Sequence, residues 1–147
     1  MSRPTAVLFT HSHAAGIDRA VEVARAAATR NGWKLVPSKE AEGLEPSLFV
    51  VLGGDGTILH ALRASLEHKI PVFCINFGRV GFLAGVEADQ IELGLDRAFA
   101  GEYEILNLPG LEITANGETQ IALNDVGFSR RPRGGVAELS YRIAGEE

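Results

Sequence analysis

A glycine-rich pentapeptide that directly follows an apolar run is the feature that most limits the folds open to this chain. Residues 48–52 read Leu-Phe-Val-Val-Leu, which is typical of a strand buried on both faces, and residues 53–57 read Gly-Gly-Asp-Gly-Thr. Residues 58–66 then have the spacing of a helix. Open α/β sheets bind ligands at such a turn, because its backbone amides can approach a phosphate closely. The sequence therefore predicts a phosphate-binding loop.

The segments around this loop predict an α/β fold. Apolar runs alternate with stretches in which apolar residues recur every three or four positions. The expected strands are 5–10, 33–36 and 71–75, and the expected helices are 17–30 and 88–100. Because strands that alternate with helices favour parallel pairing, we expect a Rossmann-like parallel sheet with flanking helices over residues 1–100.

The pattern changes from residue 101 onward and becomes β-rich. Residues 111–115 alternate between apolar and polar, Asn116-Gly117 is a strong hairpin signal, and residues 119–123 form the return strand. Residues 136–144 alternate again. Three strands are too few to close a sandwich or a barrel. We therefore expect an incomplete antiparallel β domain over residues 101–147, and a chain that is a fragment of a longer protein.

Composition excludes several classes of partner. The 147 residues carry a formal net charge of -5, which disfavours nonspecific nucleic-acid binding because that binding depends on neutralising phosphates. The single cysteine, Cys74, lies in an apolar run and is expected to be a buried thiol rather than a nucleophile. No apolar stretch has the ~18 residues that a membrane span needs, and the N-terminus has no signal-peptide pattern. We expect a cytoplasmic protein that binds small molecules.

An aspartate among the loop glycines points to chemistry rather than to binding alone. The loop has no Walker A lysine and does not fit Gly-x-Gly-x-x-Gly. A carboxylate beside a phosphate is repelled unless it handles a cation or a proton. Phosphoryl transfer to a hydroxyl needs a carboxylate that orients the nucleophile and accepts its proton, and Asp55 suits that role. It could also help to order a divalent ion. The alternative is that Asp55 caps the helix in an ordinary turn.

Gly-Gly-Asp-Gly-Thr after a buried strand resembles the signature of a superfamily that includes the NAD kinases, the diacylglycerol and sphingosine lipid kinases and, more distantly, the phosphofructokinases. Two more segments favour the NAD kinases. Residues 75–84 are similar to their Gly-x-Leu-Gly-Phe-Leu segment, with Val80 in place of the usual leucine. Asn124-Asp125 resembles their Asn-Glu/Asp motif. The resemblance covers nearly the whole chain.

The resemblance implies transfer of the ATP γ-phosphate to the 2′-hydroxyl of the adenosine ribose of NAD, which gives NADP. Asp55 would accept the hydroxyl proton. The rest of the loop would shape the phosphate site together with a divalent ion, most simply Mg²⁺: Gly53, Gly54, Gly56 and Thr57. The family usually forms dimers or tetramers, so a homo-oligomer is expected.

The resemblance also implies residues on the acceptor side. Asn124 and Asp125 would orient the ribose, although an Asn-Asp pair can also mark a turn at the end of a strand. Phe82 would pack on adenine or belong to the core. His60 would lie near NAD or be an ordinary, half-exposed helical histidine.

Other functions and residues stay open. A lipid kinase, or a nucleotide-binding homologue or fragment without catalysis, would carry the same loop. The sequence does not choose between ATP and polyphosphate, or between NAD and NADH. His11 and His13 have no metal-ligand spacing, and we assign no metal ligand. Four arginines could contact phosphate or lie in solvated loops: Arg79, Arg130, Arg131 and Arg133.

Overall fold

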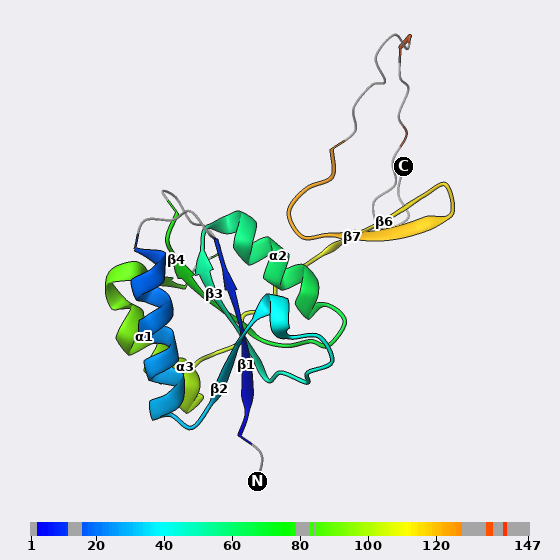
Figure 1. Cartoon of the computed structure of the whole chain (residues 1–147). Helices are drawn as coiled ribbons and strands as arrows, with labels where there is room; N and C mark the ends of the chain where they lie inside the picture. The colour runs from blue at the N-terminus through cyan, green and yellow to red at the C-terminus, as the bar shows by residue number, and fades with distance from the viewer. Residues whose placement is uncertain are drawn as a thin grey trace. The chain divides into compact units, whose positions relative to one another are not determined.

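The computed structural model describes residues 3–11, 16–78, 83, 85–127, 135, 136 and 140 (Figure 1). The chain divides between Leu108 and Pro109 into two compact units, Met1–Leu108 and Pro109–Glu147. Each unit has a sheet of its own.

The first unit is built on a five-stranded sheet in which every neighbouring pair is parallel. Its strands are β1 (Thr5–Thr10), β2 (Lys34–Pro37), β3 (Leu48–Gly53), β4 (Val72–Asn76) and β5 (Val86–Glu87), in the order β2-β1-β3-β4-β5. The order reverses between β1 and β3. In open α/β sheets ligands bind at the carboxyl ends of the strands beside such a reversal. The residues that follow β3 therefore lie at the expected ligand position.

Helices cover both faces of this sheet and make three layers (Figure 1). They are α1 (Ile17–Arg30), α2 (Asp55–Ser65) and α3 (Ile91–Ala100), with short 3₁₀ turns η1 (Ser38–Glu40) and η2 (Ala88–Gln90). Because side chains alternate along a strand, Ala6 and Leu8 pack in the cluster with α1 and α3, whereas Val7 and Phe9 pack in the cluster with α2. The predicted α/β class with a parallel sheet is confirmed.

Two elements differ from the sequence-based expectation. The helix expected at 58–66 begins at Asp55 and ends at Ser65, so the glycine loop already contains the first helical turn. Because glycine disfavours helices, Gly54 and Gly56 make this first turn hard to recognise from the sequence. The two-residue strand β5 was not expected, because a strand this short has no detectable periodicity.

The second unit contains the predicted hairpin. Strands β6 (Leu111–Ala115) and β7 (Glu118–Ala122) pair antiparallel, and both turn residues have positive φ, 54° at Asn116 and 82° at Gly117. Positive φ at both positions defines the turn that Asn-Gly favours. The further strand expected at 136–144 lies mostly outside the described residues. No helix in the described part of the chain is long and apolar enough to cross a membrane.

Candidate functional site

The glycine loop joins the carboxyl end of β3 to the first turn of α2. Gly54 is the N-cap residue, and its carbonyl oxygen accepts hydrogen bonds from Thr57 N at 3.0 Å and Ile58 N at 3.1 Å. No side chain caps the helix. The amides of Asp55 and Gly56 lie ahead of these first bonds, at the end of the helix where the dipole is positive. The loop can therefore offer backbone donors to an anion.

Packing explains one glycine of the loop but not another. A Cβ on Gly53 would lie 2.7 Å from Thr57 Oγ1, so the fold itself requires glycine there. A Cβ on Gly56 would meet nothing within 4 Å, and the φ of Gly56 is not positive. Glycine in a helix costs stability relative to alanine. Since neither packing nor backbone conformation requires Gly56, its effect is to leave bare backbone on the loop surface.

Asp55 has a buried carboxylate oxygen without a partner. Oδ1 is buried and accepts no hydrogen bond from any residue that the structure describes. Asp55 is the first helical residue rather than the cap, and no cap hydrogen bond forms, so the alternative of a capping aspartate receives no support. A buried oxygen left in this way costs free energy unless a ligand, an ion or a water satisfies it.

Cys74 on β4 lies close enough to Asp55 for the charge of that carboxylate to affect the pKa of its thiol. Burial of the thiol, followed by the negative charge of Asp55, raises the pKa of Cys74 to about 12. The thiol is buried, as the sequence predicted, and it is protonated at neutral pH. It is therefore no candidate nucleophile.

The loop that follows β4 meets the glycine loop. Phe77 N donates to Gly53 O at 3.1 Å, and a Cβ on Gly54 would lie 3.6 Å from Gly78 Cα. Asn76, which is buried, accepts a hydrogen bond from Gly78 N at 2.8 Å. Sequence analysis missed Asn76, although a polar residue that ends an apolar strand was the available signal. The aromatic candidate Phe82 and the candidate Arg79 lie outside the described residues.

His60 lies on α2, the helix that begins with Asp55 of the loop. Its ring is exposed and meets the ring of Phe9 edge to face, with centroids 5.7 Å apart. Because Phe9 belongs to β1, this contact joins α2 to the strand on the other side of the reversal in strand order. The imidazole thus contacts β1 while it stays exposed.

Of the remaining candidates, His11 belongs to the first unit with the loop, and Asn124 and Asp125 belong to the second. Asn124 and Asp125 follow β7 in the second unit, and both are exposed. His11 is exposed and directly follows Thr10 of β1, which is the register partner of Leu52, the residue before the loop. The other candidates lie outside the described residues: His13, Arg130, Arg131 and Arg133. No group of three or more His, Cys, Asp or Glu side chains in the described ranges could hold a metal ion.

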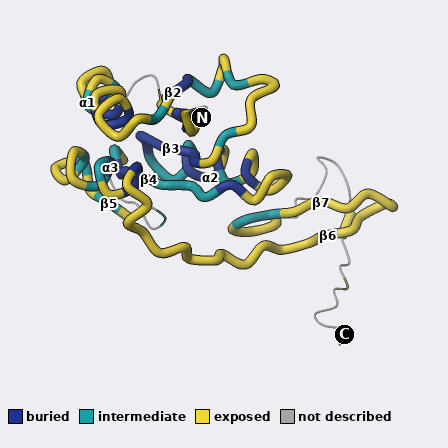
Figure 2. Tube along the Cα trace, turned by 90° about the horizontal axis from the view of Figure 1, so that it is seen from below, coloured by how far each residue is buried: buried dark blue, intermediate teal, exposed yellow. Residues whose placement is uncertain are grey.

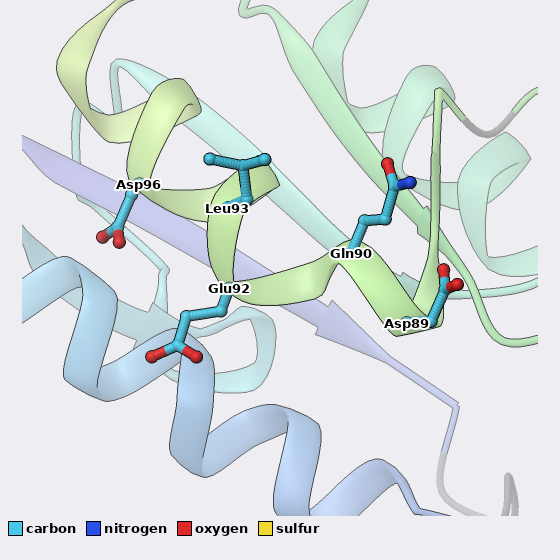
Figure 3. A pocket seen from close by; sticks show the side chains of 5 residues that line it. All are labelled: Asp89, Gln90, Glu92, Leu93 and Asp96. Atoms are coloured by element: carbon cyan, nitrogen blue, oxygen red, sulfur yellow. The ribbon is translucent and has the colours of Figure 1, made fainter.

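An open pocket on the surface of η2 and α3 is not a candidate for the nucleotide (Figure 3). It is lined by Asp89, Gln90, Glu92, Leu93 and Asp96. Three of these side chains are carboxylates and none is a cation, so the pocket would repel a polyphosphate. The carboxylate of Asp96 is occupied in any case, because Arg30 Nη2 donates to both of its oxygens at 2.9 Å.

Comparison with known proteins identifies relatives of the chain. The family model of the ATP-NAD kinase N-terminal domain matches residues 38–103. The NAD kinase of Nitrosomonas europaea is 36% identical over 136 residues, which are 89% of this chain and 46% of that protein. The NAD kinase of Clostridium kluyveri is 42% identical over 91 residues, 59% of this chain and 32% of that protein. The chain spans less than half the length of these relatives.

Among solved structures, yeast NADH kinase in complex with NADH matches with a TM-score of 0.59 and 15% sequence identity, over 83% of this chain and 46% of that one. At this identity the likeness concerns the fold alone, and it agrees with the parallel sheet described above. The family match includes the glycine loop, and the curated relatives extend the similarity over most of the chain. The chain belongs to the NAD kinase family.

Proposed function

We propose that this chain supplies the phosphate-binding loop and the proton acceptor of an ATP-dependent NAD kinase, which transfers the γ-phosphate of ATP to the 2′-hydroxyl of the adenosine ribose of NAD and gives NADP. The observation that carries the proposal is the buried, unpartnered Oδ1 of Asp55 on a loop of bare backbone. Membership of the NAD kinase family supports the substrates.

In this mechanism the loop amides of Gly54, Asp55 and Gly56 hold phosphate oxygens, and the hydroxyl of the acceptor donates its hydrogen bond to the carboxylate of Asp55. Asp55 takes the proton as the hydroxyl oxygen attacks the γ-phosphorus, and ADP leaves. Positioning supplies most of the rate in such reactions, because the protein forms no covalent intermediate. Thr57 packs against Gly53 and fixes the turn that carries Asp55.

A divalent cation fits this loop. Mg²⁺ prefers oxygen ligands, usually one or two carboxylates with phosphate oxygens and waters, and Asp55 has a free carboxylate oxygen. Asp55 would help to hold the ion, which neutralises charge on the transferring phosphate when it is bound.

We also propose which residues bind the acceptor NAD, and where the protein acts. Asn124 and Asp125 orient the ribose hydroxyls, while His60 and Phe82 contact the nucleotide. The protein acts in the cytoplasm on small-molecule nucleotides, as a homo-oligomer, and binds no nucleic acid. Its net charge of -5 supports the last point.

Asp55→Asn tests the proposal. Amide oxygens accept protons poorly, so we expect NADP formation to fall by roughly 100-fold or more, the usual contribution of a general base. The assay uses the chain itself and a chimera in which it replaces the matching segment of the Nitrosomonas europaea NAD kinase. ATP binding to the chain, measured by calorimetry, should stay within about threefold, because backbone amides rather than Asp55 hold the phosphates.

Asp18→Asn is the matched control. Asp18 also lies in the first turn of a helix, α1, and is exposed, so its loss removes the same favourable charge at a helix start without touching the loop. It should leave NADP formation unchanged. An Asp55→Asn chimera with near-normal turnover would refute the proton-acceptor role.

The alternative is that the chain is a nucleotide-binding part that needs further residues for turnover, because the match covers only 46% of the Nitrosomonas europaea protein. In that case the chain binds ATP but forms NADP only in the chimera. Diacylglycerol offered to the same chimera tests the lipid-kinase alternative, for which we expect no phosphorylation.

A further inference from the structure

We propose that Asn76 is a positioning residue: it holds the loop after β4 against the glycine loop and thereby sets the place of Gly54 and Asp55. This inference rests on the proposed function, which makes the position of Asp55 decisive for the rate. Asn76 itself would touch neither substrate.

Asn76 is one of only two polar side chains that are buried in the described ranges, and it is 7% exposed. Both ends of its amide group are used. Oδ1 accepts from Gly78 N at 2.8 Å, and Nδ2 donates to Glu87 Oε2 at 3.4 Å. A buried amide group costs free energy unless it is hydrogen-bonded, so these two bonds fix the orientation of the side chain.

The bond to Gly78 bends the chain directly after β4. An asparagine that accepts a hydrogen bond from the amide two residues later closes a turn that mimics a backbone turn. Gly78 is thereby brought to the glycine loop, since a Cβ on Gly54 would lie only 3.6 Å from Gly78 Cα. Both positions are glycine, so the two backbones approach without a Cβ from either residue. A shift of the segment after β4 can reach the glycine loop through the hydrogen bond that Phe77 N donates to Gly53 O, which is 3.1 Å long.

The hydrogen bond from Asn76 to Glu87 connects β4 to the short strand β5. Asn76 and Glu87 are register partners at the end of the β4–β5 pair, while Gly53 and Asn76 are partners at the end of the β3–β4 pair. Phe77 N donates to Gly53 O and extends the second pairing by one bond. Asn76 thus joins the ends of three neighbouring strands at the edge of the sheet that carries the glycine loop.

The test begins with the 147-residue chain without nucleotide. Asn76→Ala should make the Gly78 amide exchange with solvent about tenfold faster or more, because its hydrogen bond is lost. The NMR signals of the Gly54 and Asp55 amides should shift in the same variant. In the chimera, kcat for NADP formation should fall by roughly 10- to 100-fold, as a small misplacement of reacting groups does, while KM for NAD changes less.

Two further variants separate positioning from general stability. Ser65→Ala removes the other buried polar side chain, whose Oγ donates to Leu62 O at 2.7 Å near the far end of α2. It should lower the melting temperature but leave kcat and the Gly54 and Asp55 signals unchanged. The pair Asn76→Asp with Glu87→Gln reverses the polarity of the contact and keeps its charge. This pair should restore protection of the Gly78 amide.

If Asn76→Ala does not fold, Glu87→Ala takes its place, because Glu87 is exposed and its loss releases one end of the Asn76 amide group. Unchanged loop signals and unchanged kcat in the folded variant would overturn the inference and leave the proposed function standing. Normal turnover in both the Asn76→Ala and the Asp55→Asn chimeras would overturn the proposed function, and the inference with it.

Discussion

The two units of the chain differ in how much of their own surface they bury, and the contrast is visible in Figure 2. In the first unit both faces of the sheet carry buried clusters, and every residue of β3 is buried. In the second unit no residue of β6 or β7 is buried, and only Ile113 and Ala122 are even half-buried. The first unit therefore has a core of its own, whereas the hairpin is held by its ladder and its turn.

This difference bears on the proposed site. The glycine loop, Asp55 and Asn76 lie on the unit that has a core, where neighbouring strands fix their positions. Asn124 and Asp125 lie on the unit without one. A site built on packed elements keeps its geometry better than one built on exposed segments. We infer that phosphate binding is the part of the function that the chain carries most independently.

A pair of leucine substitutions tests the contrast with the largest expected effect. Leu95→Ala removes a side chain that is 0% exposed, and we expect a loss of about 3–5 kcal/mol in the free energy of unfolding, as for other buried leucines. Leu111→Ala removes one that is 50% exposed, and we expect a loss below about 0.5 kcal/mol. Denaturant unfolding followed by the fluorescence of Trp33, the single tryptophan, measures both.

Trp33 belongs to the first unit, where its Nε1 donates to Phe99 O at 2.8 Å, so its signal reports the core directly. A Leu111→Ala loss as large as that of Leu95→Ala would mean that the two units unfold as one, and the contrast would fail.

Local signals explain which parts of this structure the sequence predicts. The strands at 5–10 and 48–52 have continuous apolar runs, and Asn116-Gly117 has a backbone preference of its own, so each is visible without knowledge of the rest of the fold. The glycine loop is visible for the same reason, because its meaning comes from the strand directly before it.

Features that depend on distant partners could not be predicted. The hydrogen bond from Asn76 to Glu87 joins β4 to β5, and the approach of Gly78 to Gly54 joins the segments after β4 and β3. The influence of Asp55 on Cys74 crosses from α2 to β4. These relations arise only when parallel pairing brings the ends of β3, β4 and β5 to one edge of the sheet. The chain segment around 136–144 stays a prediction.

The first unit contains a buried titratable group, the Cys74 thiol, so its stability should depend on pH above about pH 9. The Cys74 thiol has a folded pKa of about 12 against 9.0 for an ordinary thiol. Because the folded pKa is raised, the contribution of the thiol to stability is complete below pH 9 and is lost as the pH rises from 9 toward 12. Each pH unit in that window should cost up to about 1.4 kcal/mol.

Unfolding of the wild-type chain and of Cys74→Val at about pH 8 and pH 10 measures this loss, because the variant keeps every other titrating group. The wild type should lose the additional stability and the variant should not. Equal pH dependence in both would show that the thiol is not protected by burial. Asp55→Asn should lower the pKa of Cys74, since the carboxylate of Asp55 is one of the two causes of the shift.

The smallest expected effect compares one substitution in the two units. Gly56→Ala should stabilise the first unit by about 0.4–1 kcal/mol, because its φ is not positive and a Cβ there meets nothing. Gly117→Ala should destabilise the hairpin by about 1 kcal/mol, because the φ of 82° suits glycine. Thermal unfolding by Trp33 fluorescence reads the first change, and NMR signals of the hairpin read the second.

Gly56→Ala should make the first unit more stable and at the same time weaken ATP binding. An added methyl group covers backbone on which we propose that phosphate sits, so ATP affinity measured by calorimetry should fall although the fold is firmer. Adding Ala64→Gly, at an exposed position of the same helix, should return the stability close to its original value. If ATP affinity stays low in this double variant, the loss comes from the loop surface and not from altered stability. Full affinity in Gly56→Ala would mean that the bare backbone at this position is not used by the ligand.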